Sequence, residues 1–171
     1  MSFIGIVSNR KCFENIKEKL PKNIQDQNLK LININLKSIE NIKNIKFETV
    51  IIESELNKFK MQEENLKKIC QTAQYIIINT DINKEYDIIK NENAKIITYG
   101  LNQKATVTIS SITNSRLLIY LQQNIPSKQE KSIEIEERRI KINEKNNLKT
   151  YEILIIYIIS RIYNNSIIEE I

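Results

Sequence analysis

The chain has 171 residues, 41% hydrophobic and 27% charged, a balance typical of one globular domain with a substantial core. It contains no histidine, which excludes Ser-His-Asp and Cys-His catalytic arrangements and histidine-ligated zinc. The net charge is +5, but the lysines are spread along the chain beside glutamates. A nucleic-acid interface would instead cluster basic residues with aromatics, so we expect no nucleic-acid partner.

The chain lacks the signals of an exported or membrane protein. Its first residues contain no basic leader followed by a long apolar core. The longest apolar run, Ile153 to Ile159, is far shorter than the roughly 20 residues that cross a bilayer. Cys12 and Cys70 are expected to be free, buried thiols of a reducing compartment. We therefore expect a cytoplasmic protein with no membrane partner.

Residues 1–100 read as strands that alternate with helices. Short apolar runs predict strands at Phe3–Val7, Leu29–Ile34, Phe47–Ile52, Tyr75–Ile78 and Lys95–Thr98. Amphipathic spacing predicts helices at Lys11–Leu20, Met61–Thr72 and Lys84–Lys90, with a short helix or turn at Ser38–Ile45. Because the strands are continuously apolar, we expect a parallel sheet that is covered on both faces.

Residues 101–148 have a different pattern. Extended segments are expected at Ala105–Ile112, Arg116–Gln122 and Ser132–Asn143, forming antiparallel strands with one face in water. The apolar alternation of the last segment slips across Glu136–Arg139, which predicts a bulge or turn there. The cluster Glu134, Glu136 and Glu137 is expected on the solvated face.

Residues 149–171 are expected to form a C-terminal helix. Lys149–Asn165 is too long and too uniformly apolar for an edge strand, so we interpret it as a buried helix across the sheet. Alternatively, its apolar surface forms an interface with another chain. The fold class is then α/β, a three-layer Rossmann-like single domain over residues 1–171. Its mostly parallel sheet has an antiparallel C-terminal extension and a buried C-terminal helix.

Gly100 stands where the two halves meet. It is one of only two glycines in the chain. A glycine here indicates a special backbone need, either a tight turn or a positive φ angle.

Polar residues follow the predicted parallel strands, at the edge where ligands of such sheets bind. Candidates for a nucleotide site are Asn9, Lys11, Asn79, Asp81, Tyr99 and Asn102, and candidates for a divalent cation are Glu53 and Asp81. Each has a plainer alternative. Lys11 is a solvated first-turn residue, the two carboxylates cap the following helices, and Tyr99 packs in the core.

Part of the chain resembles the central, ATP-binding domain of the Mur ligase family. The matching stretches are IIINTDINKEYD (Ile76–Asp87), IITYGLNQKATVTISSI (Ile96–Ile112) and the Lys149–Asn165 helix. VIIESE (Val50–Glu55) is similar to the strand whose terminal glutamate ligates magnesium in that family, which implies this role for Glu53. A cell-envelope role is implied by the resemblance alone.

The chain also departs from the family. FIGIVSNRK (Phe3–Lys11) lies where the family has its phosphate loop, yet SNRKCF has no loop glycine and no hydroxyl after Lys11. Only about 25 residues separate Glu53 from the Asn79 strand, too few for the family's catalytic segment. We also expect the family's flanking substrate domains to be absent. The resemblance therefore implies a core without ligase chemistry.

The chain lacks the residues that a working ligase or ATPase needs. Two other functional hypotheses therefore remain. In the first, the protein is not an enzyme, needs no cofactor and acts on a protein partner, on itself, or as a regulatory module. In the second, it is a degenerate module that still binds ATP with magnesium. The second requires an open polar cleft near Lys11, Glu53 and Asp81. The first predicts a filled edge and an exposed apolar patch elsewhere.

Overall fold

The computed structural model describes residues 2–25, 28–89, 91–129, 132–143, 146–164 and 168–171. The described strands are β1 (Ser2–Val7), β2 (Leu29–Asn33), β3 (Thr49–Ile52), β4 (Tyr75–Asn79), β5 (Lys95–Tyr99), β6 (Val107–Ile112), β7 (Arg116–Leu121) and β8 (Glu136–Lys141). The α-helices are α1 (Arg10–Lys19), α2 (Lys22–Gln25), α3 (Glu63–Gln71) and α4 (Thr150–Asn164). Among the described residues, 3₁₀ helices form at η1 (Leu36–Ile42), η2 (Leu56–Gln62) and η3 (Asp87–Ile89).

The strands form one eight-stranded sheet in the order β2-β1-β3-β4-β5-β6-β7-β8. The strands from β1 to β5 all pair in parallel, and β6 continues the sheet in parallel through the Tyr99–Val107 pair. Then β7 and β8 pair antiparallel. The expected α/β class, with a mostly parallel sheet and an antiparallel C-terminal extension, is confirmed.

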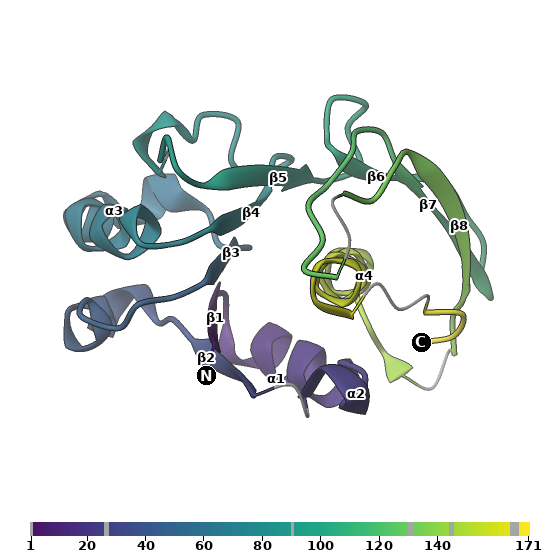
Figure 1. Cartoon of the computed structure of the whole chain (residues 1–171), viewed down its shortest axis with the longest axis horizontal. Helices are drawn as coiled ribbons and strands as arrows, with labels where there is room; N and C mark the ends of the chain where they lie inside the picture. The colour runs from purple at the N-terminus through teal and green to yellow at the C-terminus, as the bar shows by residue number, and fades with distance from the viewer. Residues whose placement is uncertain (1, 26–27, 90, 130–131, 144–145, 165–167) are drawn as a thin grey trace.

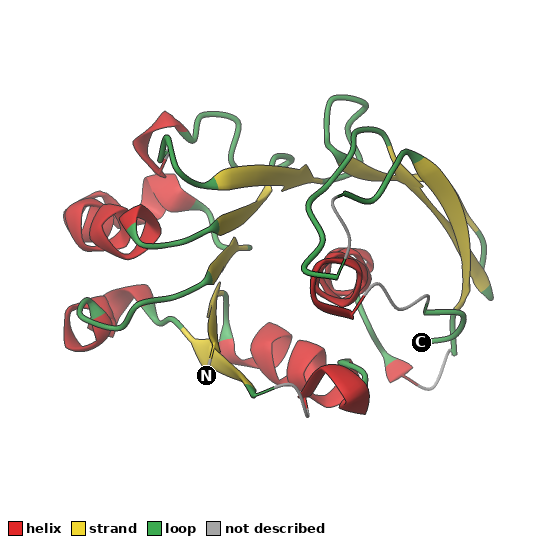
Figure 2. Ribbon diagram, viewed as in Figure 1, coloured by secondary structure: helices red, strands yellow, loops and turns green. Residues whose placement is uncertain are grey.

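Helices cover the parallel half of the sheet on both faces (Figure 2). One apolar core places α3 and η1 against one face, with Leu66 and Ile69 packed near Val50 and Ile76. The other core contains Phe13 and Ile16 of α1 together with most of α4. Three layers result, as the continuous apolar runs of the strands indicate.

The sheet curls around α4 (Figure 1), which explains why this helix is apolar on every side. Every residue from Glu152 to Tyr163 is buried. Helices α1 and α2 contact α4 on one side and β6 contacts it on another. Near its C-terminal end, the Tyr163 hydroxyl hydrogen-bonds the Thr49 hydroxyl at 2.6 Å. The predicted buried helix is confirmed, and no helix within the described ranges is long and apolar enough to cross a membrane.

The antiparallel half leaves its convex face in water, as predicted, with Glu137 and Arg139 exposed. The solvated position expected for Glu136 is wrong. This carboxylate points to the concave side, where it accepts a hydrogen bond from Tyr157 Oη at 2.9 Å and pairs with Arg161 at 3.0 Å. These hydrogen bonds, with that of Arg138, outweigh burial and hold the pKa of Glu136 below its usual range.

The bulge expected at Glu136–Arg139 is also wrong, because β8 pairs with β7 in an unbroken register. The alternation of apolar and polar residues is interrupted before β8 begins. Ile133 forms an isolated bridge with Ile125, and the chain bends at exposed Ile135 before β8 begins. The ladder irregularity lies instead in β6, between Ile109 and Ser111.

The helix predicted at Lys84–Lys90 is wrong within the described residues, and Lys90 itself lies outside them. Only the three-residue η3 forms here. The reason is Asn83, which is buried and whose side chain hydrogen-bonds the backbone of Ser54, Leu56 and Asn79. These contacts hold the start of the segment in an irregular loop, where an asparagine side chain competes with helical hydrogen bonds.

We expect Leu154→Ala to lower the free energy of unfolding by about 2–5 kcal/mol, because a fully buried α4 side chain leaves a cavity. Ile112→Ala is the matched control, since its side chain is 59% exposed and should change stability by less than about 0.5 kcal/mol. Urea denaturation of both variants measures the difference. Equal effects would contradict the central position of α4.

Candidate functional site

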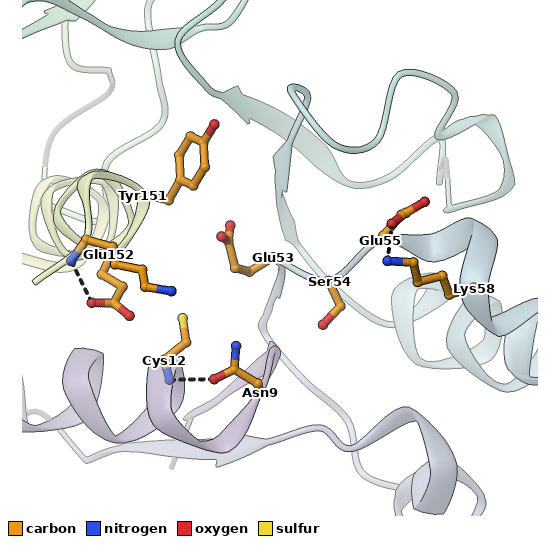
Figure 3. A pocket seen from close by; sticks show the side chains of 9 residues that line it. Asn9, Cys12, Glu53, Ser54, Glu55, Lys58, Tyr151 and Glu152 are labelled. Carbon is orange, nitrogen blue, oxygen red and sulfur yellow. Dashed lines mark hydrogen bonds and ion pairs between the residues drawn. The ribbon is translucent and has the colours of Figure 1, made fainter.

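The sheet has a topological switch point between β1 and β3, because the chain leaves β1 for β2 on one side and returns to β3 on the other. Ligands of open α/β sheets bind at such points, outside the carboxyl ends of the strands. A cavity of ≈ 280 Å³ lies here (Figure 3). It is lined by Asn9, Cys12, Glu53, Ser54, Glu55, Lys58, Lys149, Tyr151 and Glu152.

Three separate parts of the chain build this switch-point cavity: the β1–α1 junction, the end of β3 with η2, and the first turn of α4. Asn9 caps α1, because its Oδ1 accepts a hydrogen bond from the Cys12 N–H at 3.0 Å. Cys12, Glu53 and Glu152 gather around one space in Figure 3. The packing of α4 across the sheet therefore completes the site.

Glu53 is held from beneath by two fully buried side chains. Its Oε2 accepts hydrogen bonds from Asn79 Nδ2 at 3.0 Å and from the Tyr99 hydroxyl. Burial raises the pKa of Glu53, the nearby charge of Glu152 adds to the rise, and the two hydrogen bonds oppose it. Asn79 and Tyr99, both candidates from the sequence, thus position Glu53 from the core below the cavity.

Glu152 supplies a second carboxylate from the first turn of α4. It is 2% exposed and accepts hydrogen bonds from Asn15 Nδ2 at 3.1 Å and from the Lys149 backbone N–H at 2.9 Å. Burial raises the pKa of the Cys12 thiol to about 12, with the charges of Glu53 and Glu152 contributing. This thiol stays protonated at neutral pH, so it is no nucleophile.

Asp81 ties the turn after β5 to α4. It accepts hydrogen bonds from the Leu101 N–H at 2.6 Å, from Asn102 Nδ2 at 2.8 Å and from the Tyr151 hydroxyl at 2.9 Å. Burial acts to raise the pKa of Asp81, but these hydrogen bonds outweigh it and lower the pKa. Asp81 therefore stays ionised, and its hydrogen bonds hold the turn after β5 against α4.

A glycine is required at position 100 because a larger side chain would clash with neighbouring residues of this turn. The positive φ considered from the sequence is wrong, because neither glycine has one. A Cβ at Gly100 would lie 2.8 Å from the Asp81 carboxyl carbon and 2.9 Å from Asn102 Nδ2. A glycine is needed so that the Asp81 carboxylate can approach the backbone.

The sequence candidates separate into different surroundings. Asp81 and Asn102 line another cavity of ≈ 500 Å³, together with Thr80, Lys84, Tyr86, Thr98 and Lys104. Lys11 is exposed and lies in the lining of neither cavity. The sequence analysis missed Lys58, Lys149 and Glu152. The spacing of Lys149 and Glu152 is that of a helix start, but no sequence signal indicates which strands that turn meets.

Glu53 and Asp81, the cation candidates, are joined through Asn79. Its Nδ2 donates to Glu53, and its Oδ1 accepts from the Asp81 backbone N–H at 3.0 Å. In the described part of the chain, no group of three or more His, Cys, Asp or Glu side chains could hold a metal ion. Any magnesium here would need ligands from a bound phosphate as well as from the protein.

No protein-family model matches the chain, and no curated protein matches it. The site is therefore interpreted from its own chemistry. It offers carboxylates that accept hydrogen bonds, lysine amines that donate them, and a protonated thiol. Such a lining suits a small polar ligand that carries hydroxyl or amino groups.

We expect Gly100→Ala to destabilise the protein by roughly 1–3 kcal/mol, since the Asp81 carboxylate is held by several hydrogen bonds and cannot give way. Leu101→Ala is the control in the same turn, because its side chain is largely exposed. Thermal melts of both variants provide the comparison. An unchanged melting temperature in Gly100→Ala would show that Asp81 shifts freely.

We expect Glu53→Gln to stabilise the protein at pH 7.5 and to have little effect near pH 4.5. The folded state raises the pKa of Glu53, so it binds the proton more tightly than the unfolded chain does. The contribution of Glu53 to stability is thus present at low pH and falls as the pH rises through the raised pKa. Urea denaturation at both pH values tests this. A variant that loses stability as the pH rises, relative to wild type, would contradict it.

Proposed function

We propose that this chain is a non-catalytic binding module that holds a nucleotide at the carboxyl edge of its sheet. The observation that carries the proposal is the polar cavity at the switch point between β1 and β3. An open polar edge is what the nucleotide hypothesis requires, whereas the partner hypothesis predicts an edge filled by side chains. In open α/β sheets this position is also the general location of nucleotide sites.

The chemistry around the cavity supports binding without catalysis. The Cys12 thiol is protonated at neutral pH because burial raises its pKa to about 12. The Tyr99 hydroxyl is fully buried and donates to Glu53, and burial raises its pKa as well. Neither group is available as a nucleophile or base, and the sequence has no histidine to activate one.

The cavity lining is complementary to a nucleoside. Glu53, Glu152 and Asn9 carry oxygens that accept hydrogen bonds from sugar hydroxyls and base amino groups. Lys58 and Lys149 supply positive charge, although Lys58 also pairs with Glu55 at 2.7 Å. We propose that this is what survives of the ATP site implied by the Mur ligase resemblance, with the phosphate loop lost.

A partner-binding function has less support from the surface. In the described part of the chain, the exposed large hydrophobic residues are Met61, Ile82, Leu101, Ile112, Tyr120 and Ile135. Single exposed apolar side chains are normal on soluble domains, and an interface is indicated by a contiguous patch. The polar cavity therefore remains the better-supported site.

The test is a set of thermal melts with and without millimolar Mg-ATP, Mg-ADP or Mg-GTP. A ligand at 100 times its dissociation constant adds about 2.7 kcal/mol to stability, which raises the melting temperature measurably. We expect a rise in wild type, a smaller one in Lys149→Ala, which removes a lining amine, and a full one in Lys11→Ala.

Two outcomes would contradict the proposal. The absence of a shift with every nucleotide would remove the nucleotide function and redirect attention to protein partners. A shift that Lys11→Ala abolishes while Lys149→Ala keeps it would place the ligand away from the switch-point cavity.

A further inference from the structure

A basic cavity lies on the other side of the end of β1. Its volume is ≈ 490 Å³, and it is lined by Ser8, Asn9, Arg10, Asn33, Ile34, Asn35, Leu36, Lys37 and Ser54. Asn9 and Ser54 also line the switch-point cavity, so these two residues border both spaces. Each volume is of the order of small-molecule sites, roughly 300–1,000 Å³.

The two cavities have opposite electrostatic character. The basic cavity is lined by two cations, Arg10 and Lys37, and by no carboxylate. The switch-point cavity is lined by three carboxylates, which its two lysines only partly offset. A phosphate placed between Glu53 and Glu152 would be repelled, whereas the same phosphate beside Arg10 and Lys37 would be attracted.

The arginine of the basic cavity is available to bind an anion. Arg10 pairs with Glu14 at 3.3 Å, but the two side chains are 87% and 48% exposed. Exposed pairs of this kind contribute about 0–1 kcal/mol, so a bound phosphate can compete for the guanidinium. Arginine also binds phosphate oxygens through two parallel hydrogen bonds.

The floor of the basic cavity is ordered by polar contacts between β1 and β2. Asn33 Nδ2 donates to the backbone oxygen of Ser8 at 3.3 Å. On the adjoining turn, Asn35 Oδ1 accepts from the Lys37 N–H at 3.0 Å, which holds the start of η1 beside the cavity. The backbone that carries Lys37 is therefore set before any ligand binds.

We propose that the two cavities form one ligand groove across the end of β1, with the phosphates of a nucleotide on Arg10 and Lys37. The nucleoside then lies in the switch-point cavity, where Glu53 accepts hydrogen bonds from its hydroxyl or amino groups. This inference rests on the proposed function and adds the direction of the ligand and its phosphate-binding residues. Lys11, the lysine that the lost phosphate loop suggested, has no part in it.

The experiment is calorimetric titration of adenosine, AMP and Mg-ATP into wild type, Arg10→Ala/Lys37→Ala, Glu53→Gln and Lys11→Ala/Lys43→Ala. The last variant removes two positive charges outside both linings and so controls for net charge. Arg10 and Lys37 are exposed, so their variant should fold, which its melting temperature without ligand checks.

We expect Arg10→Ala/Lys37→Ala to weaken Mg-ATP binding about tenfold or more, since it loses charge-assisted contacts to phosphate, and to leave adenosine unchanged. Glu53→Gln should weaken adenosine and Mg-ATP alike. The charge control should bind as wild type does.

Equal Mg-ATP affinity in Arg10→Ala/Lys37→Ala and the charge control would overturn the phosphate assignment while nucleotide binding stands. Weaker adenosine binding in Arg10→Ala/Lys37→Ala would overturn the proposed direction of the ligand. If neither adenosine nor any nucleotide binds to wild type, the proposed function and this inference both fail.

Discussion

The other elements of the fold are arranged so that α4 is buried in the concavity of the sheet. The side chains of α4 are apolar on all sides, so the helix is shielded from water only if other elements surround it. Helices α1 and α2 close one side, and the curled antiparallel half closes the other (Figure 1). Within this contact, Glu136 accepts a hydrogen bond from Tyr157 and forms an ion pair with Arg161.

The same packing creates the site, because it brings the first turn of α4 to the carboxyl ends of β1 and β3. Glu152 and Tyr151 then face the cavity together with Glu53, which two buried side chains hold in place. The hydrogen bond between Tyr151 and Asp81 fixes the turn after β5 to the helix. The polar edge is thus a consequence of core packing, since two buried side chains position Glu53 and the buried helix α4 carries Glu152.

Much of the fold could be predicted because the spacing of apolar residues along the chain indicates which faces are buried. The runs at Tyr75–Asn79 and Thr49–Ile52 are short and apolar at nearly every position, which favours a strand with both faces covered. Predictions failed where the contacts of a single side chain determined the local backbone conformation. Asn83 turned an expected helix into an irregular loop, and Asp81 required a glycine at Gly100 for space, with no positive φ.

The strands, the buried C-terminal helix and the polar strand ends could be predicted from the sequence, because the order of apolar and polar residues along a segment indicates which of them are buried. The strand order, and with it the switch point between β1 and β3, became known only from the folded structure. That structure also shows that Lys149 and Glu152 belong to the cavity and that Lys11 does not. These outcomes depend on contacts between distant parts of the chain, such as the Asn15–Glu152 hydrogen bond across 137 positions, and such pairings depend on packing that no local pattern records.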